Sequence, residues 1–110
     1  MKVEKKESYT SIISDENSFT EFHHSFLIEE KKHQKENLIV SISSYYNATI
    51  KQFSLFLDIS EEKRKNGTSF VIVNAEVDVD DFPDNYNIVP TFQEAEDVIE
   101  MEAIERELGF

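Results

Sequence analysis

Three histidines and one acidic stretch are the groups in this sequence that could bind a metal ion. His23 and His24 are adjacent in a helical pattern, so their side chains point about 100° apart and cannot share one ion. His33 lies in a lysine-rich segment. The acidic stretch DVDDFPDN, residues 78–85, lacks both the spacing and the distal glutamate of a calcium-binding loop. We therefore expect no metal site and no cofactor.

The residue patterns of common catalytic sites are also missing. The chain has no cysteine, which excludes disulfides, thiolate ligands and a cysteine nucleophile. Its two glycines, Gly67 and Gly109, lie in no phosphate-binding frame, and no serine lies in a G-x-S-x-G motif. The sequence therefore predicts a protein that is not an enzyme.

The charge of the chain bears on its partners and its compartment. With 23 acidic residues against 11 lysines and arginines, the net charge is −12. Such a field repels nucleic acid phosphates and anionic membranes. The first residues, MKVEKKESYT, carry no apolar signal sequence, and no apolar run approaches the roughly 20 residues of a membrane span. We expect a cytoplasmic protein, monomeric or homodimeric, that binds another protein and neither nucleic acid nor membrane.

Hydrophobic patterns predict one α/β domain over residues 1–110. Residues 2–6 and 8–14 fit two short strands, and 86–89 fit an edge strand. The apolar runs at 37–42 and 69–73 fit central strands that are covered on both faces. We predict a mixed sheet of four or five strands with helices mainly on one face. The expected core residues are Val40, Ile42, Phe53, Phe70, Ile72 and Ile99.

Three helices are expected around this sheet. Phe19, Phe22 and Phe26 form one helical stripe, and a second helix is expected to begin at Asn47 and to bury Ile50, Phe53 and Leu57. Lysines and an arginine at 63–65 suit the negative end of that helix's own dipole. The last helix begins at a predicted capping box, Thr91 to Glu94. Its expected buried face comprises Phe92, Ala95, Val98, Ile99, Met101, Ile104 and Leu108.

Two segments resemble a known family. NLIVSISSYYNATIKQFSLFL, residues 37–57, resembles the strand and following helix of STAS domains, the anti-sigma-factor antagonist family. NIVPTFQEAEDVIEMEAIERELGF, residues 87–110, resembles the end of small STAS-like proteins from Bacteroidetes-type bacteria. The resemblance implies a single STAS-like domain with a regulatory, protein-binding function.

The family's phosphorylation motif is not conserved in this chain. Where STAS antagonists carry Asp-Ser-Ser-Gly, residues 49–52 read Thr49, Ile50, Lys51 and Gln52. Ile50 stands at or beside the serine position and cannot be phosphorylated. The family helix between the last two strands is also expected to be replaced by a loop at 75–85. The resemblance thus implies a degenerate STAS-like domain whose binding is not switched.

The partner-binding surface is expected where the family docks its partner. Adjacent tyrosines in a polar segment favour an interface, because aromatic side chains are common interface anchors. The alternative is that one tyrosine covers the end of the sheet and the other is incidental. The helix start at Asn47 is expected to offer free amides. The candidate residues are Tyr45, Tyr46, Asn47, Thr49, Lys51 and Gln52. Any homodimer is expected to use Phe110 and the strand at 86–89.

Similar small proteins carry the label ribonuclease Z, the name of a tRNA 3′-processing hydrolase. That enzyme class uses an H-x-H-x-D-H metal motif, which EFHHSF at residues 21–26 does not match. The alternative to a free-standing binding module is therefore an accessory subunit of such an enzyme. A subunit that completes its active site with a partner chain is also open.

Overall fold

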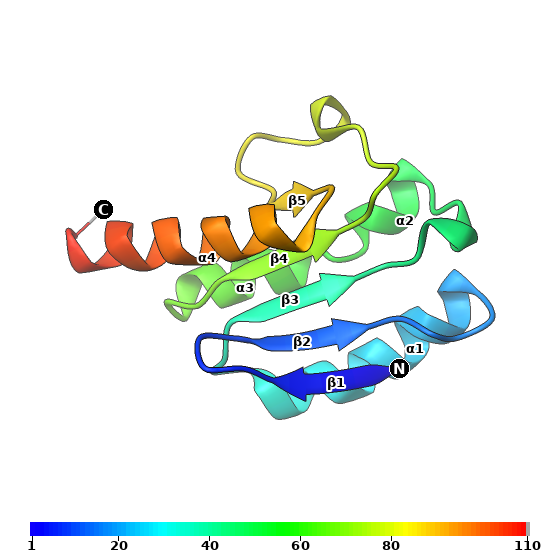
Figure 1. Ribbon diagram of the computed structural model, residues 1–110, viewed down its shortest axis with the longest axis horizontal. Coiled ribbons are helices and arrows are strands. Elements are labelled where there is room, and N and C mark those ends of the chain that lie inside the picture. The colour runs from blue at the N-terminus through cyan, green and yellow to red at the C-terminus, as the bar shows by residue number, and fades with distance from the viewer. Residues whose placement is uncertain (110) are drawn as a thin grey trace.

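Five short strands form one mixed sheet within residues 1–109, the part of the chain that this computed structural model describes (Figure 1). The order across the sheet follows the order in the chain. β1 pairs with β2 antiparallel, and the remaining neighbours pair parallel. This confirms the predicted α/β class. The strands are β1 (Lys2–Lys5), β2 (Thr10–Ile13), β3 (Leu38–Ser41), β4 (Phe70–Val73) and β5 (Ile88–Val89).

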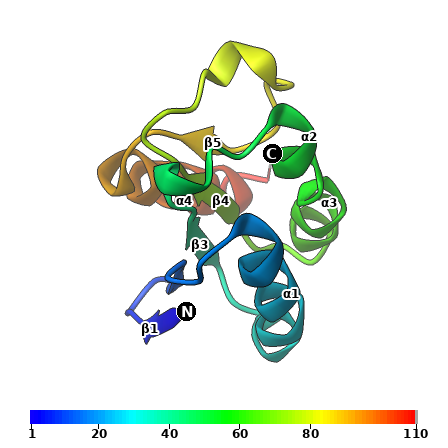
Figure 2. The ribbon, with the colours of Figure 1, turned by 90° about the vertical axis from the view of Figure 1, so that its right-hand side faces the viewer.

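Helices cover both faces of the sheet unequally. Figure 1 shows α4 in front of the strands, with α1 and α3 behind them, and Figure 2 shows α1, α2 and α3 together on one side. Most helices thus share one face, as predicted, and α4 alone packs on the other. The helices are α1 (Phe19–Glu30), α2 (Ile50–Ser54), α3 (Leu57–Lys65) and α4 (Phe92–Glu107). Short 3-10 turns are η1 (Lys31–His33), η2 (Ser44–Tyr46) and η3 (Val79–Asp81).

Two hydrophobic cores result from this arrangement. The larger core lies between the sheet and α1 to α3, where phenylalanine rings pack edge to face, such as Phe26 and Phe56 with centroids 5.2 Å apart. The smaller core joins Ala95 and Ile99 of α4 to the apolar residues of β3 and β4. Since both faces of these two strands are covered, their sequences LIVS and FVIV show almost no alternation of apolar and polar residues. All the predicted core residues are buried.

The predicted second helix is wrong in its start and its continuity. α2 begins at Ile50 and ends at Ser54, and the helix is interrupted at Leu55 and Phe56 before α3 begins. Thr49 caps α2 by accepting a hydrogen bond from the Gln52 amide at 3.1 Å, while Gln52 accepts from the Thr49 amide at 2.9 Å. This local capping box fixes the helix start three residues later than the apolar spacing indicates. The connection from β4 to β5 contains the turn η3 and no α-helix, as expected.

The last helix begins after Thr91 as predicted, but one bond of its cap and the environment of its second half differ from the prediction. At its start, Thr91 accepts from the Glu94 amide at 3.1 Å, but the Glu94 carboxylate binds the Thr91 hydroxyl instead of its amide. Towards its end, Met101, Ile104 and Leu108 are exposed instead of buried. The reason is that α4 continues past the amino ends of the parallel strands, so no sheet lies beneath that half (Figure 1). Phe110, the residue expected at a homodimer contact, lies outside the described residues.

Candidate functional site

The predicted partner-binding residues lie at the edge of the sheet formed by the carboxyl ends of the parallel strands. In open α/β sheets this edge holds ligands where the strand order reverses. Here the order runs from β1 to β5 without reversal, so the sheet within residues 1–109 has no such switch point. The edge is instead covered by the segment from η2 to α2, which carries all the predicted residues.

Tyr46 is partly buried and packs against the larger core, which fits the structural alternative for one of the two tyrosines. Its ring stacks on Phe22 with centroids 6.5 Å apart, and its hydroxyl donates to the carbonyl of Glu16 at 2.7 Å. Burial raises the pKa of the Tyr46 hydroxyl. Tyr46 therefore closes the end of the sheet.

Tyr45 has the opposite environment. Its side chain is 81% exposed, the largest exposure among the large hydrophobic residues of 1–109. Its amide donates to the hydroxyl of Ser43 at 3.1 Å, which fixes the backbone at the start of η2. The side chain thus projects into solvent from a backbone that is held on both sides.

Asn47, Thr49 and Gln52 are used within the chain itself. Asn47 has a left-handed backbone with φ 48° and its amide donates to Ser44 at 3.1 Å, which ends η2. Asparagine tolerates this conformation better than most residues. Thr49 and Gln52 form the capping box of α2. The expectation that a helix starting at Asn47 offers free amides is therefore wrong, because the helix starts at Ile50 and is capped by Thr49.

Three further exposed side chains, Ile50, Lys51 and Leu55, follow Tyr45 in the sequence. Lys51 takes part in no ion pair among residues 1–109, and Leu55 follows it one helical turn later on the same outward side. Ile50 was predicted to be buried but is 51% exposed, because α2 turns only Phe53 fully inward. We call Tyr45, Ile50, Lys51 and Leu55 the η2–α2 surface. The sequence did not indicate Ile50 and Leu55 as surface residues of a site, because apolar residues at helical spacing are usually assigned to a buried face.

A small polar hollow lies beside this surface. It has a volume of about 200 Å³ and is lined by Ser44, Asn47, Ala48, Phe53, Asn74 and Glu76. Its Asn74 amide group donates to the carbonyl of Ile42 at 2.9 Å and accepts from the Glu76 amide at 3.0 Å. Small-molecule sites usually have at least about 300 Å³. The hollow is therefore a shallow surface depression in which the Asn74 side chain is already bonded.

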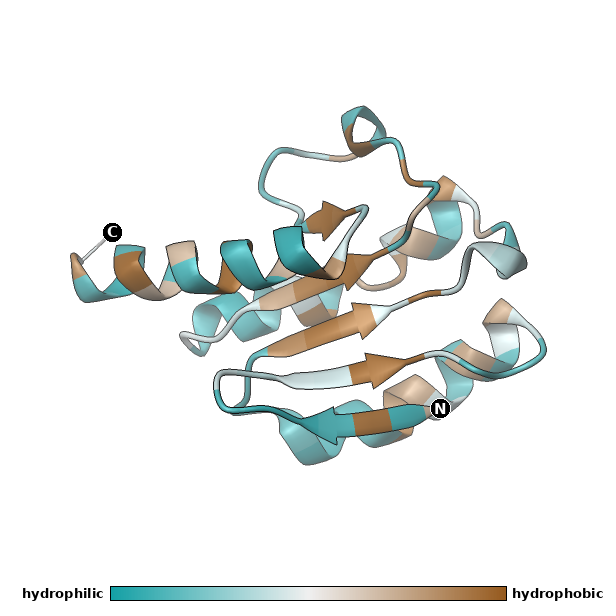
Figure 3. Cartoon of the chain, in the orientation of Figure 1, coloured by the Kyte–Doolittle hydropathy of each residue, from teal (hydrophilic) through white to brown (hydrophobic). Residues whose placement is uncertain are grey.

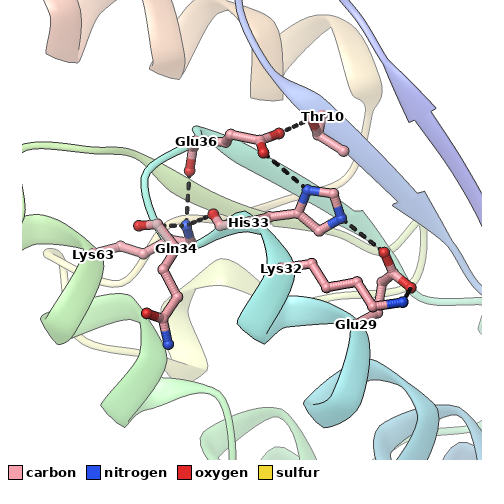
Figure 4. Close-up of polar contacts among 7 residues, drawn as sticks. All are labelled: Thr10, Glu29, Lys32, His33, Gln34, Glu36 and Lys63. Atoms are coloured by element: carbon pink, nitrogen blue, oxygen red, sulfur yellow. Dashed lines mark hydrogen bonds and ion pairs between the residues drawn. The ribbon is translucent and has the colours of Figure 1, made fainter.

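The opposite edge of the sheet carries a hydrogen-bonded network around His33 (Figure 4). His33 Nε2 lies 2.8 Å from the Glu29 carboxylate, and Nδ1 lies 3.1 Å from that of Glu36. The Thr10 hydroxyl donates to Glu36 at 2.5 Å. These bonds lower the pKa of Glu36, with Thr10 as the main cause, and that of Glu29, with His33 as the main cause. The network joins α1, the loop before β3, and β2.

Lys63 completes this network from α3. Its ammonium donates to the carbonyls of Glu36 at 2.7 Å, His33 at 2.8 Å and Gln34 at 3.5 Å, and the residue is 2% exposed. Burial lowers the pKa of this ammonium. Lys63 lies in the last turn of its helix, as predicted, and in addition its ammonium binds the carbonyls that follow α1. Every member of the network is engaged in holding the fold.

The remaining histidines, His23 and His24, form no metal-binding group with His33 among the described residues. His23 lies between the rings of Phe19 and Phe56, at centroid distances of 5.7 Å and 5.4 Å, and burial lowers its pKa. Among residues 1–109, no group of three or more histidines, cysteines or acidic residues could hold a metal ion. No helix in the same range is long and apolar enough to span a membrane.

Comparison with known proteins places the chain in a family. No curated protein matches it. A family model, described as Domain of unknown function DUF1829, matches residues 17–91, from just before α1 to the first residue before α4. The match includes the whole η2–α2 surface and leaves out the β1–β2 hairpin and α4. Because it covers more than half of the chain, the protein belongs to the DUF1829 family.

Proposed function

We propose that this protein is a non-enzymatic protein-interaction module that binds its partner through the η2–α2 surface. The observation that carries the proposal is the exposed Tyr45 on a fixed backbone, followed in the chain by exposed Ile50, Lys51 and Leu55. Tyrosine offers a large contact area with few rotatable bonds, so burying it at an interface costs little conformational entropy. Tyr46 and the Thr49 capping box hold the segment in place before any partner binds.

The STAS resemblance supports the same location. In that family the segment after the third strand docks a partner and is switched by phosphorylation of a serine. Ile50 stands at or beside that serine position here, so we propose constitutive binding with a regulatory or accessory role. We further propose that the protein acts in the cytoplasm, which its lack of cysteine suits.

Charge favours a partner with a basic surface. The segments that follow β2 and β4 start at the same edge as the η2–α2 surface and carry six carboxylates, namely Asp15 and Glu16, which pair with the Met1 ammonium, and Glu76, Asp78, Asp80 and Asp81. Lys51 is the one cation on the η2–α2 surface itself, and we propose that it pairs with a carboxylate within the otherwise basic surface of the partner, so that Lys51→Glu places two like charges together. Complementary charges raise the association rate and fix the orientation of a complex. The same acidic edge disfavours nucleic acid and anionic membranes as partners.

The test compares partner capture by two matched double variants. Tyr45→Ala with Lys51→Glu removes the anchor and reverses the cation, whereas Ile28→Ala with Lys31→Glu makes the same kinds of change at two exposed residues, Ile28 of α1 and Lys31 of η1 directly after it. Tyr46 is left intact because its buried contacts support the fold. We expect the first variant to bind a partner captured from native extract at least about tenfold more weakly than wild type, a loss of about 1.4 kcal/mol.

The α1 variant is expected to bind like wild type, and both variants should unfold at the same temperature as wild type. Equal binding by all three proteins would refute the proposed surface. If the captured partner is a hydrolase that is inactive without this chain, the accessory-subunit alternative takes the place of a free-standing module.

A further inference from the structure

The second half of α4 has its polar side facing the protein and its apolar side facing solvent. On the inner side, Glu102 accepts hydrogen bonds from the Ser69 hydroxyl and the Asn87 amide group, each at 2.7 Å. Arg106 donates to the Ser69 hydroxyl at 2.5 Å. These contacts hold the helix at the amino ends of β4 and β5 although none of its described residues after Ile99 is buried.

The outer side carries three large apolar residues. Met101 is 59%, Ile104 50% and Leu108 68% exposed. At about 100° per residue, these side chains fall within an arc of about 60°, so they form one stripe. We call them the α4 stripe. Figure 1 shows this half of α4 extending past the sheet, and Figure 3 shows apolar segments interrupting its hydrophilic ribbon.

Local folding does not explain this stripe. Single exposed apolar residues are ordinary, but three at spacings of three and four on one helix face are typical of helix pairing. The polar contacts of Glu102 and Arg106 already hold the helix in place. We infer that the α4 stripe is a docking surface for an amphipathic helix with basic flanks, supplied by another protein.

The charges beside the stripe determine the kind of helix that fits. Exposed carboxylates flank it on both sides, with Glu100 and Glu107 on one side and Glu105 on the other, while Glu94 and Asp97 continue its line towards the start of the helix. A second copy of this helix would bring like charges together, which disfavours self-association. A partner helix with apolar residues at its centre and lysine or arginine at its edges would pair with them. This surface lies on the opposite sheet face from α2 and outside the residues matched by the family model, so it does not depend on the η2–α2 surface.

A designed peptide provides the probe. It is a labelled helix of about 18 residues, or five turns, with leucine along one stripe and lysine beside it. A second peptide carries glutamate in place of lysine. Binding is measured by fluorescence anisotropy at physiological salt, where interactions between distant exposed charges are largely screened. Met101→Ser with Ile104→Ser and Leu108→Ser removes the α4 stripe, and Leu27→Ser with Ile28→Ser removes two exposed apolar residues of α1 as a control.

We expect the basic peptide to bind the wild-type protein and the α1 control equally, and the α4 variant at least about tenfold more weakly. The acidic peptide should not bind. Tyr45→Ala with Lys51→Glu should leave peptide binding unchanged, which separates this surface from the η2–α2 surface. Unchanged binding after removal of the stripe would overturn the inference. So would a homodimer, seen by sedimentation, that disappears in the α4 variant, because the stripe would then pair with a second copy.

Discussion

The Lys63 ammonium links α3 to the connection between α1 and β3. It extends from α3 to the carbonyls of His33, Gln34 and Glu36, which lie between α1 and β3. Buried carbonyls that lose their donors cost free energy, about 1–3 kcal/mol for each group left unsatisfied. The fold therefore depends on a residue whose type usually indicates a solvated surface.

We predict that Lys63→Met lowers the free energy of unfolding by about 2–3 kcal/mol, because methionine keeps much of the stem but donates to none of these carbonyls. Lys65→Met, on the exposed side of the same helix, should change it by less than about 0.5 kcal/mol. Urea denaturation measures both. Equal effects of the two substitutions would show that the three carbonyls find other donors.

The two adjacent tyrosines show the limit of residue-level prediction. Their types indicated an anchor, and their position indicated the end of the sheet, but neither distinguishes Tyr45 from Tyr46. That distinction depends on Phe22 and Glu16, which are far from η2 in the sequence and contact only Tyr46. Contacts between distant segments of this kind are not encoded in local spacing.

At the level of elements, α2 is five residues long and depends on its cap. We predict that Thr49→Ala destabilises the protein by about 1 kcal/mol, because it removes the side-chain acceptor for the Gln52 amide. Thr49→Ser keeps that acceptor and should remain within about 0.5 kcal/mol of wild type. Thermal unfolding monitored by circular dichroism compares them. A Ser variant as unstable as the Ala variant would mean that the threonine methyl group, and not the cap, stabilises this segment.

Elements were predictable where one local pattern determines them. The apolar runs of β3 and β4 and the Thr91 start of α4 are such cases. The interruption between α2 and α3 could not be predicted, because apolar residues continue at helical spacing across it. Neither could the exposed side of α4. Periodicity shows which residues share a helix face, but Met101, Ile104 and Leu108 face solvent because the sheet ends before them.

For the whole molecule, the carboxylates of the His33 network make stability depend on pH. The pKa of Glu36 is lowered in the folded protein from an ordinary value of 4.5. A lowered pKa contributes stability that is complete above the unfolded pKa and is lost as the pH falls through the folded pKa. The high net charge adds a separate, general dependence, so the test must compare proteins that differ at one residue.

We predict that Glu36→Gln is less stable than wild type at pH 7 and that the difference in unfolding free energy shrinks as the pH falls below about 4.5. Urea denaturation at a series of pH values measures this difference. Glu7→Gln, an exposed residue near the same edge, serves as the control. A difference that stays constant down to about pH 3 would mean that the ionised form of Glu36 is not what stabilises the network.

The proposed function requires that Tyr45 itself touch the partner. A photoreactive phenylalanine analogue in place of Tyr45 keeps an aromatic ring at this exposed position and forms a covalent bond with whatever lies against it. The same analogue at Ile28 of α1 reports on contacts that any exposed position makes.

Crosslinking in native extract from position 45 is therefore the most direct measurement. We expect one discrete adduct with a single partner, reduced at least about tenfold when Lys51→Glu is also present and not formed from position 28. No adduct from position 45, or the same adducts from both positions, would contradict the η2–α2 surface as the site of partner binding.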